Sequence, residues 1–370
     1  MGKKNKAFKY RIYPDRIQEQ LMAKTCGCCR FIYNRMLSDK IEQYKKDKTM
    51  LRTTPASYKK EFPWLKEVDS LALCNVQMHL EQAYKNFFTR PDAGFPKFRS
   101  KHHSSSSYTT NLINGNIRLE NNRIRLPKIG NVRIVCHRPI PPEWNIKSVT
   151  VRKELSGKYY ASILCECDAV ENQDSVIPQN VERILGIDFA MHGLAVFSDG
   201  TSAGYPAYYS CAQKKLAREQ RKLSRCEKGS RNYEKQMKKT AKGHEKIKNQ
   251  RKDFLHKLSR KIADGYDMAA VEDIDMKAMS RSMHFGKNVM DNAYGSFLNL
   301  LAYKMEEQGK QLVKVDRFFP SSKRCSVCGN IKQDLTLSDR IYVCSCGNVM
   351  NRDVNAAINI RDEAYRQISA

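Results

Sequence analysis

The chain has 370 residues, with 66 Lys and Arg against 39 Asp and Glu, which gives a formal net charge of +27. With 41% hydrophobic and 28% charged residues, it has the composition of a folded globular protein rather than of a disordered one. The excess of positive charge argues against an ordinary enzyme of small metabolites and favours a polyanionic partner, above all nucleic acid.

The first half of the chain predicts a sheet interrupted by helices. Alternating large and basic residues predict a strand over 8–13, and Asp15 predicts the start of a helix that runs to about residue 37. Apolar residues with a period near 3.6 predict a second helix over 71–88. From about 108 to 168 the apolar period becomes 2, which predicts a small antiparallel sheet or barrel.

The second half predicts an α/β domain that begins near residue 183. A strand meander is expected first, then a long helical stretch, then strand, helix, strand and a final helix, an order typical of a ribonuclease H-like domain. The expected strands cover 184–189, 193–197, 268–272 and 312–315, and the last two helices cover 292–307 and 353–367.

The long helical stretch is strongly basic. Residues 213–262 contain 19 Lys and Arg but only 5 Asp and Glu, and Gly229-Ser230 divides them into an expected helical hairpin. A solvated, salt-bridged helix pair is the alternative interpretation. Because so few acids are present, such a face would repel itself, and we expect it to bind phosphates of nucleic acid.

Three acids occupy similar places in the expected α/β domain. Asp188 and Glu272 end strands, and Asp353 begins the last helix. Ionised acids that converge at buried strand ends are costly unless they are paired or bind a cation. Their oxygens suit Mg²⁺, and two such ions can activate water and stabilise the leaving oxygen of a phosphodiester. Spacing alone leaves capping or turn roles open for each acid.

Four of the thirteen cysteines form two close pairs. Cys325 and Cys328 are separated by 15 residues, 329–343, from Cys344 and Cys346, and a glycine directly follows each pair. Four thiolates in this pattern predict a structural Zn²⁺ site of the zinc-ribbon type, with four free thiols as the alternative. Of the other nine cysteines, we interpret Cys26, Cys28, Cys29, Cys165 and Cys167 as core residues without a metal.

The acids lie in segments that resemble a known family. Gly186-Ile187-Asp188, Val271-Glu272-Asp273 and residues 351–360 are similar to the three split motifs of a RuvC nuclease domain, in the version of the transposon-encoded TnpB nucleases and of compact type V CRISPR effectors. Further similar segments are 29–34, 94–98, 126–128 and 249–259. The resemblance implies that Asp188, Glu272 and Asp353 are catalytic Mg²⁺ ligands. Asn351 departs from the acid common in the family, and the following Asn355 aligns the catalytic acid with Asp353.

The resemblance also implies a multidomain α+β architecture. A wedge domain with a β-barrel would grip the guide RNA, a helical recognition domain would be inserted in it, and a RuvC-like domain would carry the zinc ribbon. The implied boundaries are 1–14 and 105–180 for the wedge, 15–104 for recognition, 181–322 and 347–370 for the RuvC-like domain, and 323–346 for the ribbon.

Relatives read a short duplex motif beside the target with protein side chains. Gln77, Thr110 and Asn111 fall where such residues are expected, and amide side chains can hydrogen-bond base edges. Lys97, Arg99 and Arg251 are further candidate contacts to nucleic acid. A purely structural or solvent-exposed role is the alternative for each of these six residues.

The expected function is that of an RNA-guided DNA endonuclease, with guide RNA and double-stranded DNA as partners, a two-metal Mg²⁺ site and a structural Zn²⁺. Two rivals are a guided DNA-binding protein that does not cut and a transposase with a ribonuclease H-like fold. The chain shows neither a secretory signal nor the ~18 apolar residues of a membrane span, so we expect a prokaryotic cytoplasmic protein without a membrane partner. The sequence leaves its oligomeric state open.

Overall fold

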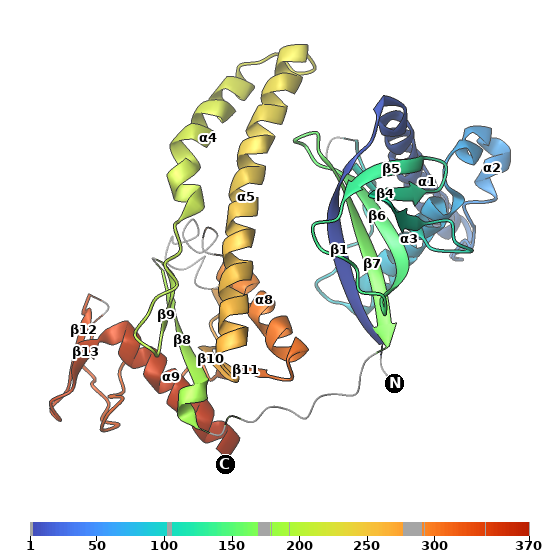
Figure 1. Cartoon of the computed structure of the whole chain (residues 1–370). Helices are drawn as coiled ribbons and strands as arrows, with labels where there is room; N and C mark the ends of the chain where they lie inside the picture. Colours follow the sequence, from blue (N-terminus) through green and yellow to red (C-terminus); the bar gives the residue numbers. More distant parts are fainter. Residues whose placement is uncertain are drawn as a thin grey trace. The chain divides into compact units, whose positions relative to one another are not determined.

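The computed structural model describes residues 3–101, 106–168, 178, 180–191, 193–276, 291, 293–336 and 338–369. The chain divides into two compact units, Met1–Ala169 and Val170–Ala370 (Figure 1). Each unit has its own hydrophobic core. Among the helices of these described residues, none is long and apolar enough to cross a membrane.

The first unit contains a seven-stranded antiparallel sheet with the order β2-β6-β7-β1-β5-β4-β3. The strands are β1 Lys3–Tyr13, β2 Ser106–Asn111, β3 Arg118–Glu120, β4 Arg123–Leu126, β5 Gly130–Val135, β6 Asn145–Lys153 and β7 Tyr159–Asp168. The outermost strands β2 and β3 do not pair with each other over the described residues. Over the described residues the sheet is open and forms a half-barrel, in agreement with the sheet of the two predicted alternatives, while the wedge domain stays a prediction.

The helices of the first unit pack on this sheet. They are α1 Arg16–Asp47, α2 Tyr58–Glu61, the 3₁₀ helix η1 Pro63–Glu67 and α3 Ser70–Thr89. Asp15 begins α1 as predicted, because its carboxylate accepts a hydrogen bond from the backbone N–H of Gln18. Ile12 of β1, Ile32 of α1 and Leu73 of α3 belong to one core, so the segments that the resemblance assigns to two domains form one compact unit.

The second unit contains a four-stranded sheet with the order β11-β10-β8-β9. Strands β8 Ile184–Ala190, β10 Met268–Glu272 and β11 Gln311–Val315 are parallel, and β9 Leu194–Phe197 is antiparallel to β8. The third strand of the expected meander is reduced to one bridge between Val196 and Ser202.

Helices cover both faces of this sheet. They are α4 Tyr208–Ser224, α5 Arg231–Gly265, α8 Tyr294–Glu307 and α9 Arg352–Ser369. Because side chains alternate along a strand, Leu185 and Ile187 pack with α5 and α8, whereas Ile184, Met268 and Ala270 pack with α9. Figure 1 shows α9 and the α5–α8 pair on opposite sides of the sheet.

The predicted basic hairpin is present as α4 and α5. The Ser230 hydroxyl caps α5 by accepting a hydrogen bond from the backbone N–H of Tyr233. A Cβ atom at Gly243 would lie 2.9 Å from Cδ2 of Leu216, so the two helices are in close contact there. The hairpin extends away from the sheet as a long arm (Figure 1).

Candidate active site and zinc centre

Asp188 lies near the carboxyl end of β8, and Glu272 ends the neighbouring parallel strand β10. Ile187 pairs with Val271 in the register of β8 and β10, and each acid follows directly after one of these residues. The alternation of side chains puts both acids on the sheet face that α9 covers. The strand order therefore brings together two acids that lie 84 residues apart in the sequence.

Gly186 allows α9 to approach this edge of the sheet. A Cβ atom at position 186 would lie 1.9 Å from the carbonyl oxygen of Ala357 and 2.8 Å from Cβ of Arg361. Only glycine permits this backbone contact between β8 and α9. Asp353 lies one helical turn before Ala357, so the contact places the start of α9 near β8, and the charge of Asp353 acts on Asp188.

The charges of Glu272 and Asp353 act on Asp188. Burial, followed by the charges of Asp353 and Glu272, raises the pKa of Asp188 to about 8, while the nearby Arg352 guanidinium opposes the shift. Burial also raises the pKa of Glu272. Arg352 pairs with Asp353 at 3.4 Å between Nη2 and Oδ1. Three oxygen donors with one guanidinium nearby fit the requirements of a divalent cation such as Mg²⁺.

Asn351 caps the last helix, α9. Its side-chain oxygen accepts hydrogen bonds from the backbone N–H groups of Asp353 at 2.9 Å and Val354 at 3.2 Å. It is thus the N-cap of α9. An amide performs this capping as well as a carboxylate does, which accounts locally for asparagine at this position.

The four predicted zinc ligands lie together, with all four sulfur atoms within 4.8 Å of one another. The Sγ–Sγ distances are 3.7 Å for Cys325–Cys346 and 3.5 Å for Cys328–Cys344. Sulfur atoms bound tetrahedrally to Zn²⁺ at about 2.3 Å lie about 3.8 Å apart. The cluster is therefore compatible with a structural zinc ion.

Two asparagines of α9 attach the zinc ribbon to the helix that carries Asp353. The side chain of Asn355 accepts from the Ser326 N–H at 3.0 Å and donates to the carbonyl of Arg324 at 2.7 Å. Asn359 donates to the carbonyl of Ser321 at 2.7 Å. In the sequence, Asn355 served only to align the third motif, and the contacts of Asn355 and Asn359 with the ribbon were not predicted. Two asparagines four residues apart on an apolar helix face do indicate buried hydrogen bonds.

Replacing Cys325 with Ser is expected to remove the bound zinc, because three thiolates cannot complete a tetrahedral S₄ site. Metal analysis of the purified protein should fall from about one zinc per chain to a small fraction of that value. Cys74→Ser is the matched control, since Cys74 is an exposed cysteine of α3 outside the cluster. Unchanged zinc in the Cys325 variant would contradict the assignment.

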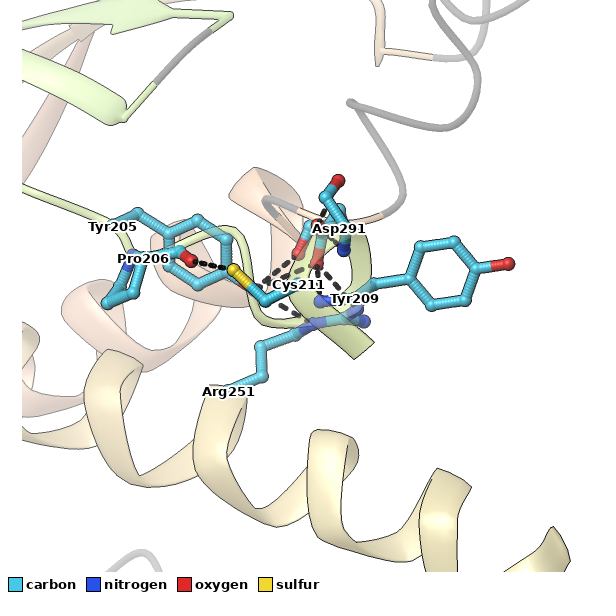
Figure 2. Close-up of polar contacts among 7 residues, drawn as sticks. Tyr205, Pro206, Tyr209, Cys211, Arg251 and Asp291 are labelled. Atoms are coloured by element: carbon cyan, nitrogen blue, oxygen red, sulfur yellow. Dashed lines mark hydrogen bonds and ion pairs between the residues drawn. The ribbon is translucent and has the colours of Figure 1, made fainter. Parts of the chain in front are cut away.

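Asp291 is a buried hydrogen-bond hub that sequence reasoning missed (Figure 2). Its carboxylate accepts from the Tyr205 hydroxyl at 3.1 Å and from the backbone N–H groups of Tyr209 and Ser210 at 3.1 and 3.2 Å. Arg251 of α5 pairs with the same carboxylate at 3.2 Å. Asp291 therefore caps α4, whose own N-cap Ala207 has no side-chain oxygen, and joins it to α5.

The hub also contains Arg251, a residue that the sequence suggested as a contact to nucleic acid. Its guanidinium pairs with Asp291, which is 3% exposed, and also donates to the Tyr205 hydroxyl at 3.4 Å. A guanidinium held in this way stabilises the base of the hairpin. The contact of Arg251 with nucleic acid stays a prediction.

Asp291→Ala is expected to destabilise the second unit by about 2–3 kcal/mol, because it leaves Arg251 and the first amides of α4 without their acceptor. Denaturant unfolding monitored by circular dichroism measures the change. Asp253→Ala is the control, since Asp253 forms an exposed pair with Lys257 within α5 and should alter stability by less than ~0.5 kcal/mol. Equal stability of the two variants would show that the hydrogen bonds of Asp291 do not stabilise the second unit.

Only some of the first-unit residues expected to contact nucleic acid lie on its surface. Gln77 is half-exposed on α3 and donates to Glu81 at 2.8 Å, Asn111 is half-buried, and Lys97 is exposed. Thr110 is fully buried in the sheet, so in this structure it cannot reach a base, contrary to expectation. It lies on the inner face of β2, where the alternation of side chains leaves no access.

A cavity of about 360 Å³ lies between α1, α3 and β2 of the same unit. Its lining includes Asn75, His79, Arg99 and Ser107. The guanidinium of Arg99 lies 3.7 Å from the ring centroid of Tyr33, so it is held in place by a cation–π contact. Arg99 thus contributes a fixed positive charge to this cavity.

Comparison with known proteins gives the family. The chain is 32% identical over 97% of its length to a "Putative RNA-guided DNA endonuclease" of Streptomyces pristinaespiralis, covering 89% of that protein. It is also 32% identical to the similarly named InsQ of Escherichia coli strain K12, over 97% of this chain and 92% of the relative. The chain belongs to the TnpB-like family of RNA-guided DNA endonucleases.

Family profiles and a solved structure agree with this membership. Residues 169–283 match OrfB_IS605, described as "Probable transposase", and residues 294–360 match the Cas12f1-like TNB domain. The fold is similar to that of the protein in a Cas12f1–sgRNA–target DNA complex, with a TM-score of 0.58, 13% identity and coverage of 97% of this chain and 99% of the other. Residues 1–49 match a helix-turn-helix profile, whereas residues 3–47 of this TnpB-like protein form one strand and one continuous helix.

Proposed function

We propose that this protein cuts DNA at the edge of the four-stranded sheet, with Asp188, Glu272 and Asp353 as ligands of Mg²⁺ in a RuvC-like site. The proposal is supported by the placement of Asp188 and Glu272 on neighbouring parallel strands, with the charges of Glu272 and Asp353 acting on Asp188, in a chain of this family. A bound divalent cation would supply the positive charge that activates water and stabilises the leaving oxygen.

The residues of the chain have distinct tasks in this proposal. The three carboxylates hold the cation, and Arg352 offsets part of their charge and orients Asp353. The basic hairpin of α4 and α5, with 19 Lys and Arg over residues 213–262, binds phosphates of guide RNA or DNA. Sequence is then selected by pairing between the guide and one DNA strand. Because the relatives come from bacteria, we propose the bacterial cytoplasm as the place of action.

We further propose that α3 and β2 read the short duplex motif beside the target. Gln77 and Asn111 present amide groups there, and the adjacent cavity offers Asn75, His79 and the fixed charge of Arg99. Amides can pair with adenine edges and guanidinium groups with guanine edges in the major groove. Thr110 is not part of this set because its side chain is buried.

Sequencing the RNA that co-purifies with the protein from its native locus tests guidance directly. A discrete RNA with a constant scaffold and a variable end is the expected result. Its constant part would derive from a transposon end or from CRISPR repeats, which identifies the system that the protein serves. A smear of unrelated cellular RNA would contradict guidance and leave only a basic nuclease.

A further inference from the structure

Tyr294, the first residue of α8, is buried at the strand ends of the second unit. Its side chain is 1% exposed, and its ring centroid lies 4.7 Å from that of Phe189, the residue directly after Asp188. A second ring, that of Phe297, lies at 6.1 Å. The phenol is therefore held by packing next to the strand that carries Asp188.

The hydroxyl of Tyr294 has no hydrogen-bond partner among the described residues. Buried polar atoms are nearly always paired, and an exception calls for a missing partner such as a water or an ion. A phenylalanine would fill the same space without burying an unpaired hydroxyl. The hydroxyl thus adds nothing to the packing of the core.

The acid nearest to Tyr294 in the sequence is already fully engaged. Asp291, three residues earlier, accepts hydrogen bonds from Tyr205, Tyr209 and Arg251 at one oxygen. Its other oxygen accepts two hydrogen bonds from Ser210. Figure 2 shows how these donors surround the carboxylate, so Asp291 is not a free acceptor for the phenol.

Two other carboxylates act on the hydroxyl. Burial, followed by the charges of Asp188 and Glu272, raises the pKa of Tyr294 far above its ordinary value. The hydroxyl consequently keeps its proton at neutral pH and remains a hydrogen-bond donor. The two acids that influence it are those to which we assign the cation.

We propose that Tyr294 is a positioning residue whose hydroxyl donates a hydrogen bond into the carboxylate site when a divalent cation is bound. The acceptor is a free oxygen of Asp188 or Glu272, or a water molecule on the cation. This inference rests on the proposed function, because it needs a metal at these acids. Hydrogen-bond partners outside the ligand set commonly change metal affinity about 10–100-fold.

Tyr294→Phe tests the proposal, with Mn²⁺ as the probe and the full chain with its co-purified RNA as the sample. Electron paramagnetic resonance of free Mn²⁺ measures affinity without any need for cleavage. We expect about 10-fold weaker Mn²⁺ binding and a melting temperature in EDTA no lower than that of the unchanged protein. Cleavage should recover when Mn²⁺ is raised to saturation.

Tyr159→Phe is the matched control, because Tyr159 is also buried with an unpaired hydroxyl but lies in the first unit. It should leave Mn²⁺ binding unchanged. Asp188→Ala distinguishes the role of Tyr294 from the existence of the metal site itself. If Asp188→Ala abolishes Mn²⁺ binding and Tyr294→Phe does not weaken it, the role of Tyr294 is refuted alone. If Asp188→Ala leaves Mn²⁺ binding intact, the proposed metal site itself is refuted.

Discussion

Replacing Gly186 with Ala is expected to abolish DNA cleavage and to destabilise the second unit by about 3 kcal/mol or more. The added Cβ would lie 1.9 Å from a backbone carbonyl oxygen of α9, and a backbone atom cannot move aside as a side chain can. The helix must shift as a whole, which takes Asp353 away from Asp188. Unfolding in denaturant and a cleavage assay measure the two effects.

Gly295→Ala is the matched control for this prediction. Gly295 lies in the first turn of α8, and a Cβ atom there would meet nothing within 4 Å. Alanine should therefore be neutral or slightly stabilising at this position. A Gly186 variant as stable and active as the Gly295 variant would show that close contact between β8 and α9 is not required.

Asp188→Asn is expected to reduce cleavage about 1,000-fold or more. An amide is a poor ligand for a hard cation, so only the carboxylates of Glu272 and Asp353 would remain to bind Mg²⁺. Binding of the guide RNA should remain, since it depends on basic surfaces. A cleavage time course and an RNA gel-shift assay measure these two quantities. Asp264→Asn, an exposed acid of α5, is the control and should cut normally.

The same substitution is expected to stabilise the metal-free protein above pH 7, with a pH dependence that follows from the pKa of Asp188. The folded pKa of about 8 is above the ordinary 3.8, so between these values the folded state binds more protons than the unfolded state. The stability contributed by this site therefore falls as pH rises from about 4 to 8.

Asparagine does not ionise, so the variant keeps this stability. The difference in unfolding free energy in favour of the variant should therefore grow from pH 4 to 8 and be complete above pH 8. At least about 1 kcal/mol is expected, because each unit of pKa shift corresponds to about 1.4 kcal/mol. Denaturant unfolding in EDTA at pH 5 and pH 8 measures it. A stability difference that is equal at both pH values would contradict the electrostatic account of the site.

The sequence was informative wherever a local pattern determines local structure. Apolar runs that end in an acid predicted β8 and β10, the glycine-serine break predicted the hairpin, and the spacing of Cys325 to Cys346 predicted the cluster. Asp353 was a candidate from its place at the start of the last expected helix, and the resemblance aligned it with the third motif. The roles of these acids remain predictions.

Features that depend on tertiary packing were not predictable in this way. The Asp291 hub joins groups that lie 40 to 86 residues away in the chain, and no pattern around Asp291 marks it as a helix cap. Thr110 and Arg251 were assigned by position within the family. In the folded protein one is buried by the register of β2, and the other is held by Asp291.

Guide-programmed cleavage by the purified protein–RNA complex tests the proposed function most directly. A plasmid that carries a sequence complementary to the guide, beside a library of flanking motifs, is incubated with Mg²⁺ or with EDTA. We expect cuts only in matched plasmids, only with Mg²⁺, and only beside a restricted set of motifs. Cleavage that ignores the guide sequence, or that proceeds equally in EDTA, would contradict RNA-guided, Mg²⁺-dependent cleavage.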